Sequence, residues 1–194
     1  MIILEGCDNA GKSTLLKQLL ELDPSLRVLK RDRFKPERGE TIGTSYLNAL
    51  LPPPDGDRQA HAHSIADRFL ASECIYGALF RGGCRMTPNE HFLIKTTLLS
   101  YGALVVWCDP GPYNVRKGWE NREQLYNKDP LAIWAAYDTR LSKIFFPIPI
   151  WKYDWSSPSA TKDRETIIQL HHERMQQYAL DLSWPVVGCE TSSR

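Results

Sequence analysis

The chain has 194 residues, about the length of one α/β domain, and its 42% hydrophobic and 24% charged residues are typical of a globular protein. A formal net charge of +1 gives no general attraction to nucleic acid. The five cysteines have no C-x-x-C spacing, so we expect reduced thiols in a cytoplasmic protein, and no cysteine zinc site or disulfide framework. No apolar run approaches the roughly 20 residues that cross a bilayer, so we expect no membrane partner.

The hydrophobic pattern alternates between strands and helices along the chain. Thr87, Pro88 and Glu90 give one predicted helix a capping box and a favourable first residue. Alternation of this kind favours a parallel sheet with helices on both faces. Short apolar runs predict strands at residues 1–5, 26–30, 64–66, 103–108 and 149–153. Amphipathic or capped segments predict helices at residues 14–20, 87–101, 129–143 and 161–178.

The most informative segment follows the first predicted strand. Residues 6–13 match G-x-x-x-x-G-K-[ST], the phosphate-binding P-loop, and a strand precedes them while a helix follows. In such a loop backbone N–H groups bind phosphate oxygens, the lysine reaches the β- and γ-phosphates, and the hydroxyl holds Mg²⁺. We therefore expect ATP and Mg²⁺ as cofactors, with Lys12 also acting in catalysis. The residues expected to bind ATP are Gly6, Asn9, Ala10, Gly11, Lys12, Ser13 and Thr14, with Ser13 also holding the metal.

Together, the motif and the alternating pattern predict the α/β fold of P-loop NTPases. This fold is a three-layer sandwich in which a parallel sheet lies between two layers of helices. We predict that residues 1–194 form a single domain of this type.

A second constellation lies where the third predicted strand ends, at Asp67 and Arg68. Ligands of open α/β folds bind at the carboxyl edge of the sheet, and the P-loop lies at the same edge. A carboxylate there is suited to hold a metal-bound water, and an arginine is suited to clamp a phosphate with its planar fork. We assign Asp67 to catalysis and to the metal.

These segments resemble the thymidylate kinases. Residues 4–14 are similar to the family's P-loop, which has Glu-Gly before it and an aspartate at the place of Asp8, and residues 67–76 resemble its Asp-Arg-aromatic motif with a later Ser and Tyr. The resemblance implies transfer of the γ-phosphoryl group of ATP to a deoxynucleoside monophosphate such as dTMP. It implies that Asp8 faces the acceptor sugar and Arg68 holds the acceptor phosphate. The residues assigned to acceptor binding are Asp8, Arg31, Arg33, Phe34, Arg68, Ser72 and Tyr76.

Two further parts of the site are expected nearer the C-terminus. Residues 110–128 form a polar, basic connection in which we expect a lid, because phosphoryl transfer needs cations that neutralise the transferring oxygens while water is excluded. Arg116, Lys117 and Arg122 are the candidates, and we assign Arg116 and Arg122 to catalysis. By the resemblance alone, residues 155–159 are where an adenine-contacting loop lies. Phe34, Phe69 and Tyr76 are candidates to stack on an acceptor base.

Three interpretations from different classes stay open. The first is a nucleotide kinase of the thymidylate kinase type, whose partner is a small nucleotide. The second is a phage P-loop kinase, in the host cytoplasm, that phosphorylates a modified base such as 5-hydroxymethyluracil within DNA. Residues 30–41 favour it, because they are basic and do not match the family's Arg-Glu-Pro-Gly-Gly-Thr loop.

The third interpretation, a nucleotide-binding regulatory switch, is the weakest. It needs an N-K-x-D motif, and residues 127–130 have proline where the aspartate is required. For any of the three, a homodimer stays open.

Overall fold

The structure is a computed structural model that describes residues 1–29, 39–52, 56–120 and 129–183, with side chains to residue 177. Its centre is a five-stranded sheet in which every pair of neighbouring strands is parallel, in the order β2-β3-β1-β4-β5. The strands are β1 (Ile2–Glu5), β2 (Arg27–Leu29), β3 (Ser64–Asp67), β4 (Leu104–Cys108) and β5 (Ile150–Tyr153).

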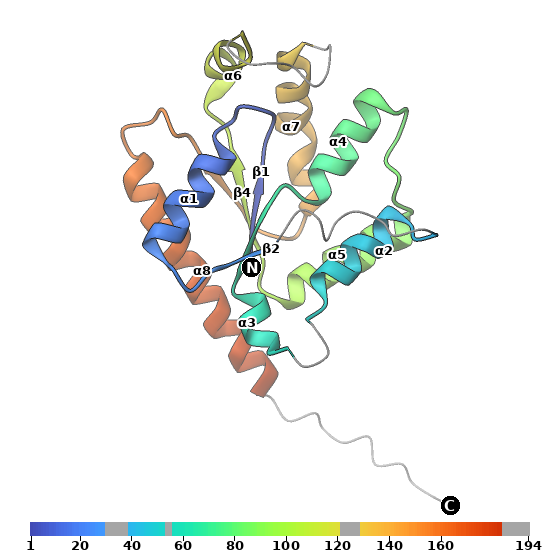
Figure 1. Ribbon diagram of the computed structural model, residues 1–194, viewed down its shortest axis with the longest axis vertical. Coiled ribbons are helices and arrows are strands. Elements are labelled where there is room, and N and C mark those ends of the chain that lie inside the picture. Colours follow the sequence, from blue (N-terminus) through green and yellow to red (C-terminus); the bar gives the residue numbers. More distant parts are fainter. Residues whose placement is uncertain (30–38, 53–55, 121–128, 184–194) are drawn as a thin grey trace, which may run out of the picture.

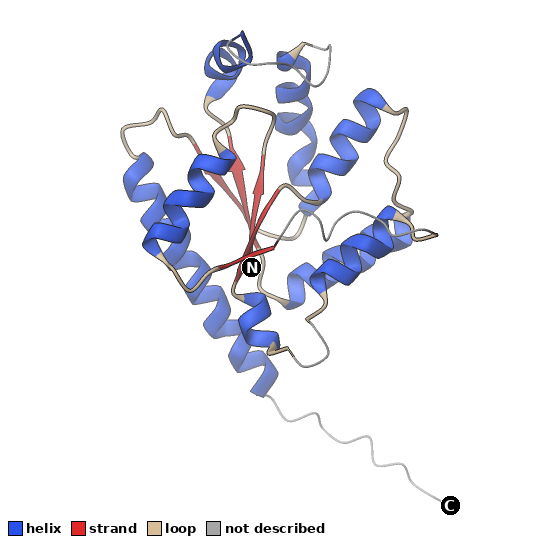
Figure 2. Ribbon diagram, viewed as in Figure 1, coloured by secondary structure: helices blue, strands red, loops and turns tan. Residues whose placement is uncertain are grey.

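Helices cover both faces of this sheet, and Figure 2 shows the strands lying between them. On one side are α1 (Lys12–Leu22), α3 (Arg58–Ala62) and α8 (Ala160–Ser183), with α8 in contact with both of the others (Figure 1). On the other side are α2 (Ile42–Leu50), α4 (Leu70–Phe80), α5 (Pro88–Ser100) and α7 (Pro130–Phe145). A further helix, α6 (Gly111–Glu120), packs on α7 at the carboxyl edge of the sheet.

This architecture confirms the predicted α/β fold with a parallel sheet between helices. The predicted start of α5 is also confirmed, because Thr87 and Glu90 form the expected capping box. Asp129 caps α7 as its position before a proline predicted, and its side chain accepts a hydrogen bond from the N–H of Leu131. In the described part of the chain, no helix has the length and apolar character needed to cross a bilayer.

The core holds the P-loop between two buried elements. All four residues of β1 are fully buried at the centre of the sheet. On α1, Leu15 and Leu19 lie one turn apart and are also fully buried, which places one face of the helix against the sheet. Burying such a side chain contributes roughly 1.5–3 kcal/mol, so the strand and helix on either side of the loop are firmly fixed.

Candidate active site

The backbone of the P-loop is shaped by close contacts that only glycine permits at two positions. Gly6 has a φ of 144°, and a Cβ there would lie 2.6 Å from the carbonyl oxygen of Cys108. Gly11 has a φ of 86°, and a Cβ there would lie 2.7 Å from the ring of Trp155. The loop is therefore packed tightly against β4 on one side and against the segment after β5 on the other. Within the loop, Ala10 is fully buried.

Lys12 is held across this loop. Its ammonium nitrogen donates hydrogen bonds to the carbonyl oxygens of Gly6 and Cys7, at 2.9 and 2.5 Å. Burial, with a contribution from the charge of Arg68, lowers the pKa of Lys12 from its ordinary value. Because a partly desolvated ammonium attracts an anion more strongly than one in bulk water, Lys12 is suited to contact a phosphate.

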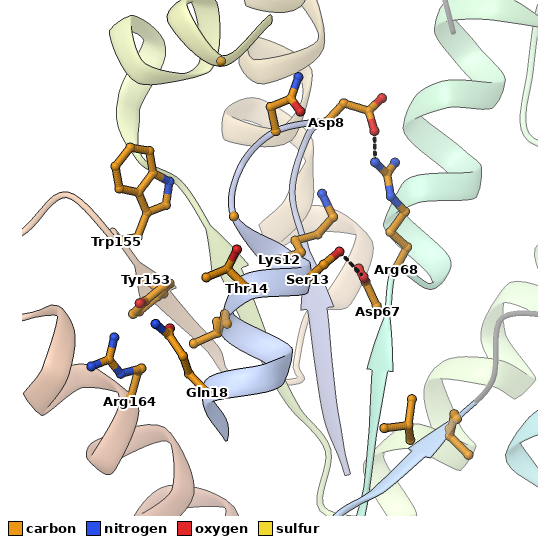
Figure 3. Close-up of a pocket in the computed structure, with 16 residues that line it drawn as sticks. Asp8, Lys12, Ser13, Thr14, Gln18, Asp67, Arg68, Tyr153, Trp155 and Arg164 are labelled. Carbon is orange, nitrogen blue, oxygen red and sulfur yellow. Dashed lines mark hydrogen bonds and ion pairs between the residues drawn. The ribbon is translucent and has the colours of Figure 1, made fainter. Parts of the chain in front are cut away.

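Ser13 and Asp67 meet at the carboxyl end of the two central strands. Residue 67 lies beside Leu4 in the parallel register of β1 and β3, which brings its carboxylate to the first turn of α1. The Ser13 hydroxyl donates to Asp67 Oδ2 at 3.0 Å (Figure 3). The other carboxylate oxygen, Oδ1, is buried and has no hydrogen-bond partner. The Ser13 hydroxyl and the Asp67 carboxylate, one of whose oxygens is free, form an all-oxygen donor set, which fits Mg²⁺.

Arg68 lies beside the P-loop, at the cavity, in a backbone conformation that costs energy. Its φ is 70°, in the left-handed region, and its N–H donates to the carbonyl of Leu4 at 2.9 Å. The guanidinium forms an ion pair with Asp8, and it lies 5.3 Å from the ring centre of Tyr76. The hydroxyl of Tyr76 donates to the second carboxylate oxygen of Asp8 at 2.9 Å. Strain of this kind at a cavity is a mark of functional sites.

A buried carboxylate that sequence reasoning missed holds the Arg68 segment in place. Glu5 Oε1 accepts the backbone N–H groups of Phe69, Ala71 and Ser72, at 3.0, 2.9 and 3.4 Å. Its Oε2 accepts the hydroxyl of Ser72 at 2.8 Å. Burial raises the pKa of Glu5, and these hydrogen bonds act against that rise. Glu5 thereby caps the N-terminus of α4 from a different strand.

Two expectations for the acceptor side are corrected by this network. Ser72 does not line the cavity: it is buried and its hydroxyl is used by Glu5 and by Tyr137, whose oxygen lies 2.8 Å away. Phe69 is fully buried and packs on the ring of Tyr46 at 4.7 Å, so it has no face for a base. Both residues serve the packing that supports Arg68.

The P-loop, Asp67, Asp8 and Arg68 all line one cavity of about 750 Å³. Figure 3 shows Asp8 and Arg68 on one side of the P-loop lysine, with Trp155, Tyr153 and Arg164 on the other. Trp155 lies where the resemblance expected an adenine loop, whereas Gln18, Tyr153 and Arg164 were not predicted. The sequence does contain a signal that could have pointed to Arg164, because this residue lies in the first turns of the helix that follows the last strand.

The expected lid segment is partly a helix rather than a connection. Residues 111–120 form α6, whose entry is fixed by a hydrogen bond from the N–H of Gly111 to Asp109 at 3.0 Å. Gly118 lines the cavity, and a Cβ there would lie 3.2 Å from the Cβ of Asn9. Arg116 is two-thirds exposed and pairs with Glu120 on the helix surface at 3.7 Å, so the structure does not bring it into the cavity. Whether this segment closes stays a prediction.

Several predicted site residues lie outside the described residues. They are Arg31, Arg33, Phe34 and Arg122. Their assignments to acceptor binding and catalysis remain predictions.

Comparison with known proteins gives a likeness of fold. No protein-family model matches this chain, and a search of curated proteins finds no match. Among solved structures, it is similar to the YorR protein from Bacillus subtilis, crystallised in complex with phosphorylated GDP. The two are 23% identical, with a TM-score of 0.65 over 89% of this chain and 97% of that chain. The chain therefore has an α/β P-loop-like fold of the kind that the YorR protein also has.

Proposed function

We propose that the protein is a kinase that transfers the γ-phosphoryl group of ATP to the phosphate of a deoxynucleoside monophosphate, such as dTMP. The observation that carries this proposal is that the P-loop lines one cavity in which the Asp8–Arg68 ion pair lies on one side of Lys12 and Trp155 on the other. The complex of the YorR protein with phosphorylated GDP supports a nucleotide ligand for a cavity in this fold.

The donor side is built to bind a nucleoside triphosphate. The N–H groups of the P-loop and the N-terminus of α1 would bind the phosphates, and Lys12 would neutralise the charge that spreads over the transferring oxygens. Ser13 and Asp67 would hold Mg²⁺, which when bound supplies positive charge at the β- and γ-phosphates. Trp155, beside Gly11 at the cavity wall, offers an aromatic face to the adenine ring.

The acceptor side is built to bind an anion. Arg68 presents the planar fork that suits a phosphate, and an acceptor phosphate would compete with Asp8 for it. Release from Arg68 would leave the Asp8 carboxylate next to the acceptor, where it can accept a hydrogen bond from a free 3′-hydroxyl. Within DNA that oxygen is esterified and flanked by a negative phosphate, which a nearby carboxylate disfavours. Asp8 therefore favours a free nucleotide over the DNA substrate of the second interpretation.

The transfer itself needs no general base. An ionised oxygen of the acceptor phosphate attacks the γ-phosphorus, and the bond from that phosphorus to the β–γ bridging oxygen breaks. ATP and the monophosphate thus become ADP and a diphosphate, with no proton to remove from the nucleophile. Catalysis then rests on positioning and on cations at the transferring group, which are the contributions that Lys12, Arg68 and the metal would make.

The test is to incubate the protein with γ-labelled ATP, Mg²⁺ and a panel of acceptors. The panel contains the four common deoxynucleoside monophosphates and duplex DNA with a hydroxymethylated pyrimidine. The proposal expects label in one or more free diphosphates. Label in the DNA alone would establish the DNA kinase instead, and label released only as inorganic phosphate would favour a hydrolysing switch.

The comparison of wild type with Asp8→Asn on the same panel isolates the acceptor side. The proposal expects Asp8→Asn to weaken phosphorylation of the free nucleotides. Robust labelling of the polymer by both proteins, with none of the free nucleotides, would overturn it.

A further inference from the structure

A cluster of histidines and a carboxylate lies at the edge of the sheet opposite the cavity. Asp23 follows α1 as its C-terminal cap, and His63 follows α3 immediately before β3. His172 lies on α8, which runs down to this edge beside α3 (Figure 1). Three segments that are far apart in the sequence therefore contribute one side chain each, and Asp23 and His172 are 149 residues apart.

The donor atoms of these side chains converge on one point. Asp23 Oδ2 lies 2.8 Å from His172 Nε2 and 3.3 Å from His63 Nε2. One donor atom from each of the three residues lies within 4.8 Å of the others, which is the only such group of three found among the described residues. A tetrahedral zinc site with bonds of about 2.0–2.1 Å needs donor atoms about 3.3 Å apart. The Asp23–His63 separation already matches this value, and the Asp23–His172 separation would have to widen by about 0.5 Å.

A neighbouring histidine orients one of the ligands of this cluster. The other ring nitrogen of His63, Nδ1, lies 3.0 Å from Nε2 of His171, and the two rings are stacked with centroids 5.0 Å apart. His171 is fully buried, so its ring has a fixed position behind His63. This contact holds the ring of His63 with Nε2 toward Asp23 and toward the hydroxyl of Ser25, which lies 2.9 Å from Nε2.

The carboxylate is held in position as well. Ser25 donates to Asp23 Oδ1 from its backbone N–H at 3.1 Å and from its hydroxyl at 2.5 Å. The second oxygen, Oδ2, thereby faces the two histidines.

We propose that Asp23, His63 and His172 bind one divalent transition-metal ion, for which Zn²⁺ is the best match. Two imidazole nitrogens and one carboxylate oxygen suit zinc, whereas Mg²⁺ and Ca²⁺ prefer oxygen ligands throughout. His172 is about half exposed and lines two shallow surface hollows, so an ion and a water in the fourth position reach the site from solvent. The proposal is independent of the kinase activity.

A metal here would act as a cross-link. It would tie the end of α1, the start of β3 and the middle of α8 to one another, which restricts the unfolded chain across a long loop. The same α8 carries Arg164 to the cavity at its other end, so the ion would also fix the helix that forms one wall of the active site. The competing arrangement is metal-free, with both histidines donating to Asp23.

Equilibrium dialysis of the full chain against Zn²⁺, without nucleotide, tests the proposal. The protein carries Cys84→Ser throughout, because the Cys74 and Cys84 sulfurs lie 3.1 Å apart and could bind zinc themselves. His172→Gln and His63→Gln each remove one ligand. The matched control is His91→Gln, which changes a histidine on α5 outside the cluster.

We expect the parent protein to bind one zinc ion per chain. Both ligand variants should bind zinc more than about tenfold more weakly, since even changes to the partners of metal ligands cost about 10–100-fold in affinity. The zinc affinity of His91→Gln should be unchanged. Zinc should also raise the melting temperature of the parent protein and not that of His172→Gln. No binding by the parent, or binding that neither ligand variant weakens, would overturn the proposal. Should a variant fail to fold, zinc-dependent shifts of the His63 and His172 ring resonances in the parent decide it instead, and their absence counts against the site.

Discussion

The carboxylate of Glu5, at the end of β1, accepts a hydrogen bond from the backbone N–H of Phe69 at 3.0 Å. Phe69 lies between Arg68 and the first residue of α4. Phe69 occupies the N-cap position of α4, and it has no side-chain oxygen with which to cap the helix. Glu5 supplies that oxygen from a strand 64 residues earlier in the chain. The strand that leads into the P-loop and the segment that carries Arg68 are thus joined through one buried side chain.

Removing this carboxylate should destabilise the protein strongly. Glu5→Ala leaves three backbone N–H groups and a hydroxyl without their acceptor, and we expect the free energy of unfolding to fall by about 3 kcal/mol or more. Glu5→Gln keeps one acceptor oxygen and should lose less than half as much. Urea unfolding measures both. Glu21→Ala, at an exposed position on α1, is the control and should change stability by less than about 0.5 kcal/mol; equal losses at the two positions would contradict the anchoring role of Glu5.

Trp155 should contribute to ATP binding without contributing to the chemical step. Stacking of a base on an aromatic ring is worth about 1–3 kcal/mol, so Trp155→Ala should raise the KM for ATP by about tenfold while kcat changes little. Trp155→Phe keeps an aromatic face and should retain most of the affinity. Steady-state kinetics at saturating acceptor separates the two parameters. A fall in kcat at unchanged KM would place Trp155 elsewhere in the reaction.

The thiol of Cys7 should be unreactive although it lies in the P-loop. Burial raises its pKa to about 11, and burial raises that of Cys108 to about 12. At pH 8 roughly one Cys7 thiol in 10³ is ionised, so iodoacetamide should label the exposed Cys84 long before Cys7 or Cys108, with kinase activity retained. Labelling of Cys7 should increase about tenfold from pH 8 to pH 9, because the thiolate fraction does so below its pKa. Peptide mass spectrometry gives the rates, and comparable rates for Cys7 and Cys84 would contradict the buried position.

The elements that could be predicted from the sequence are those determined by residues close to one another in the chain. The capping residues Thr87 and Glu90 and the proline between them lie within four positions, so the start of α5 could be predicted from sequence. The P-loop could be predicted because its glycines, its lysine and its flanking strand and helix are contiguous. The placement of Asp67 near Ser13 followed from the rule that strands of a parallel sheet end at one edge.

The remaining features depend on tertiary contacts that no local pattern encodes. Helix α2 has Gly43 in its first turn and was not predicted; it packs along α5, where a Cβ on that glycine would lie 2.3 Å from Glu90. Helix α6 contains a proline and two glycines, which favour a connection over a helix, but it buries Val115 and packs on α7. The partners of Glu5 and the Asp23–His63–His172 cluster come from distant segments, so the sequence contains no motif for either.

The central claim is that the cavity beside the P-loop transfers a phosphoryl group through Lys12. The most direct measurement is the kcat for label transfer from ATP to the preferred free nucleotide in Lys12→Ala, with Lys17→Ala on the exposed face of α1 as the matched control. We predict that Lys12→Ala lowers kcat by about 10²–10³-fold or more while its circular dichroism spectrum stays that of the wild type, and that Lys17→Ala leaves kcat unchanged. A folded Lys12→Ala protein with near-normal turnover would contradict the claim.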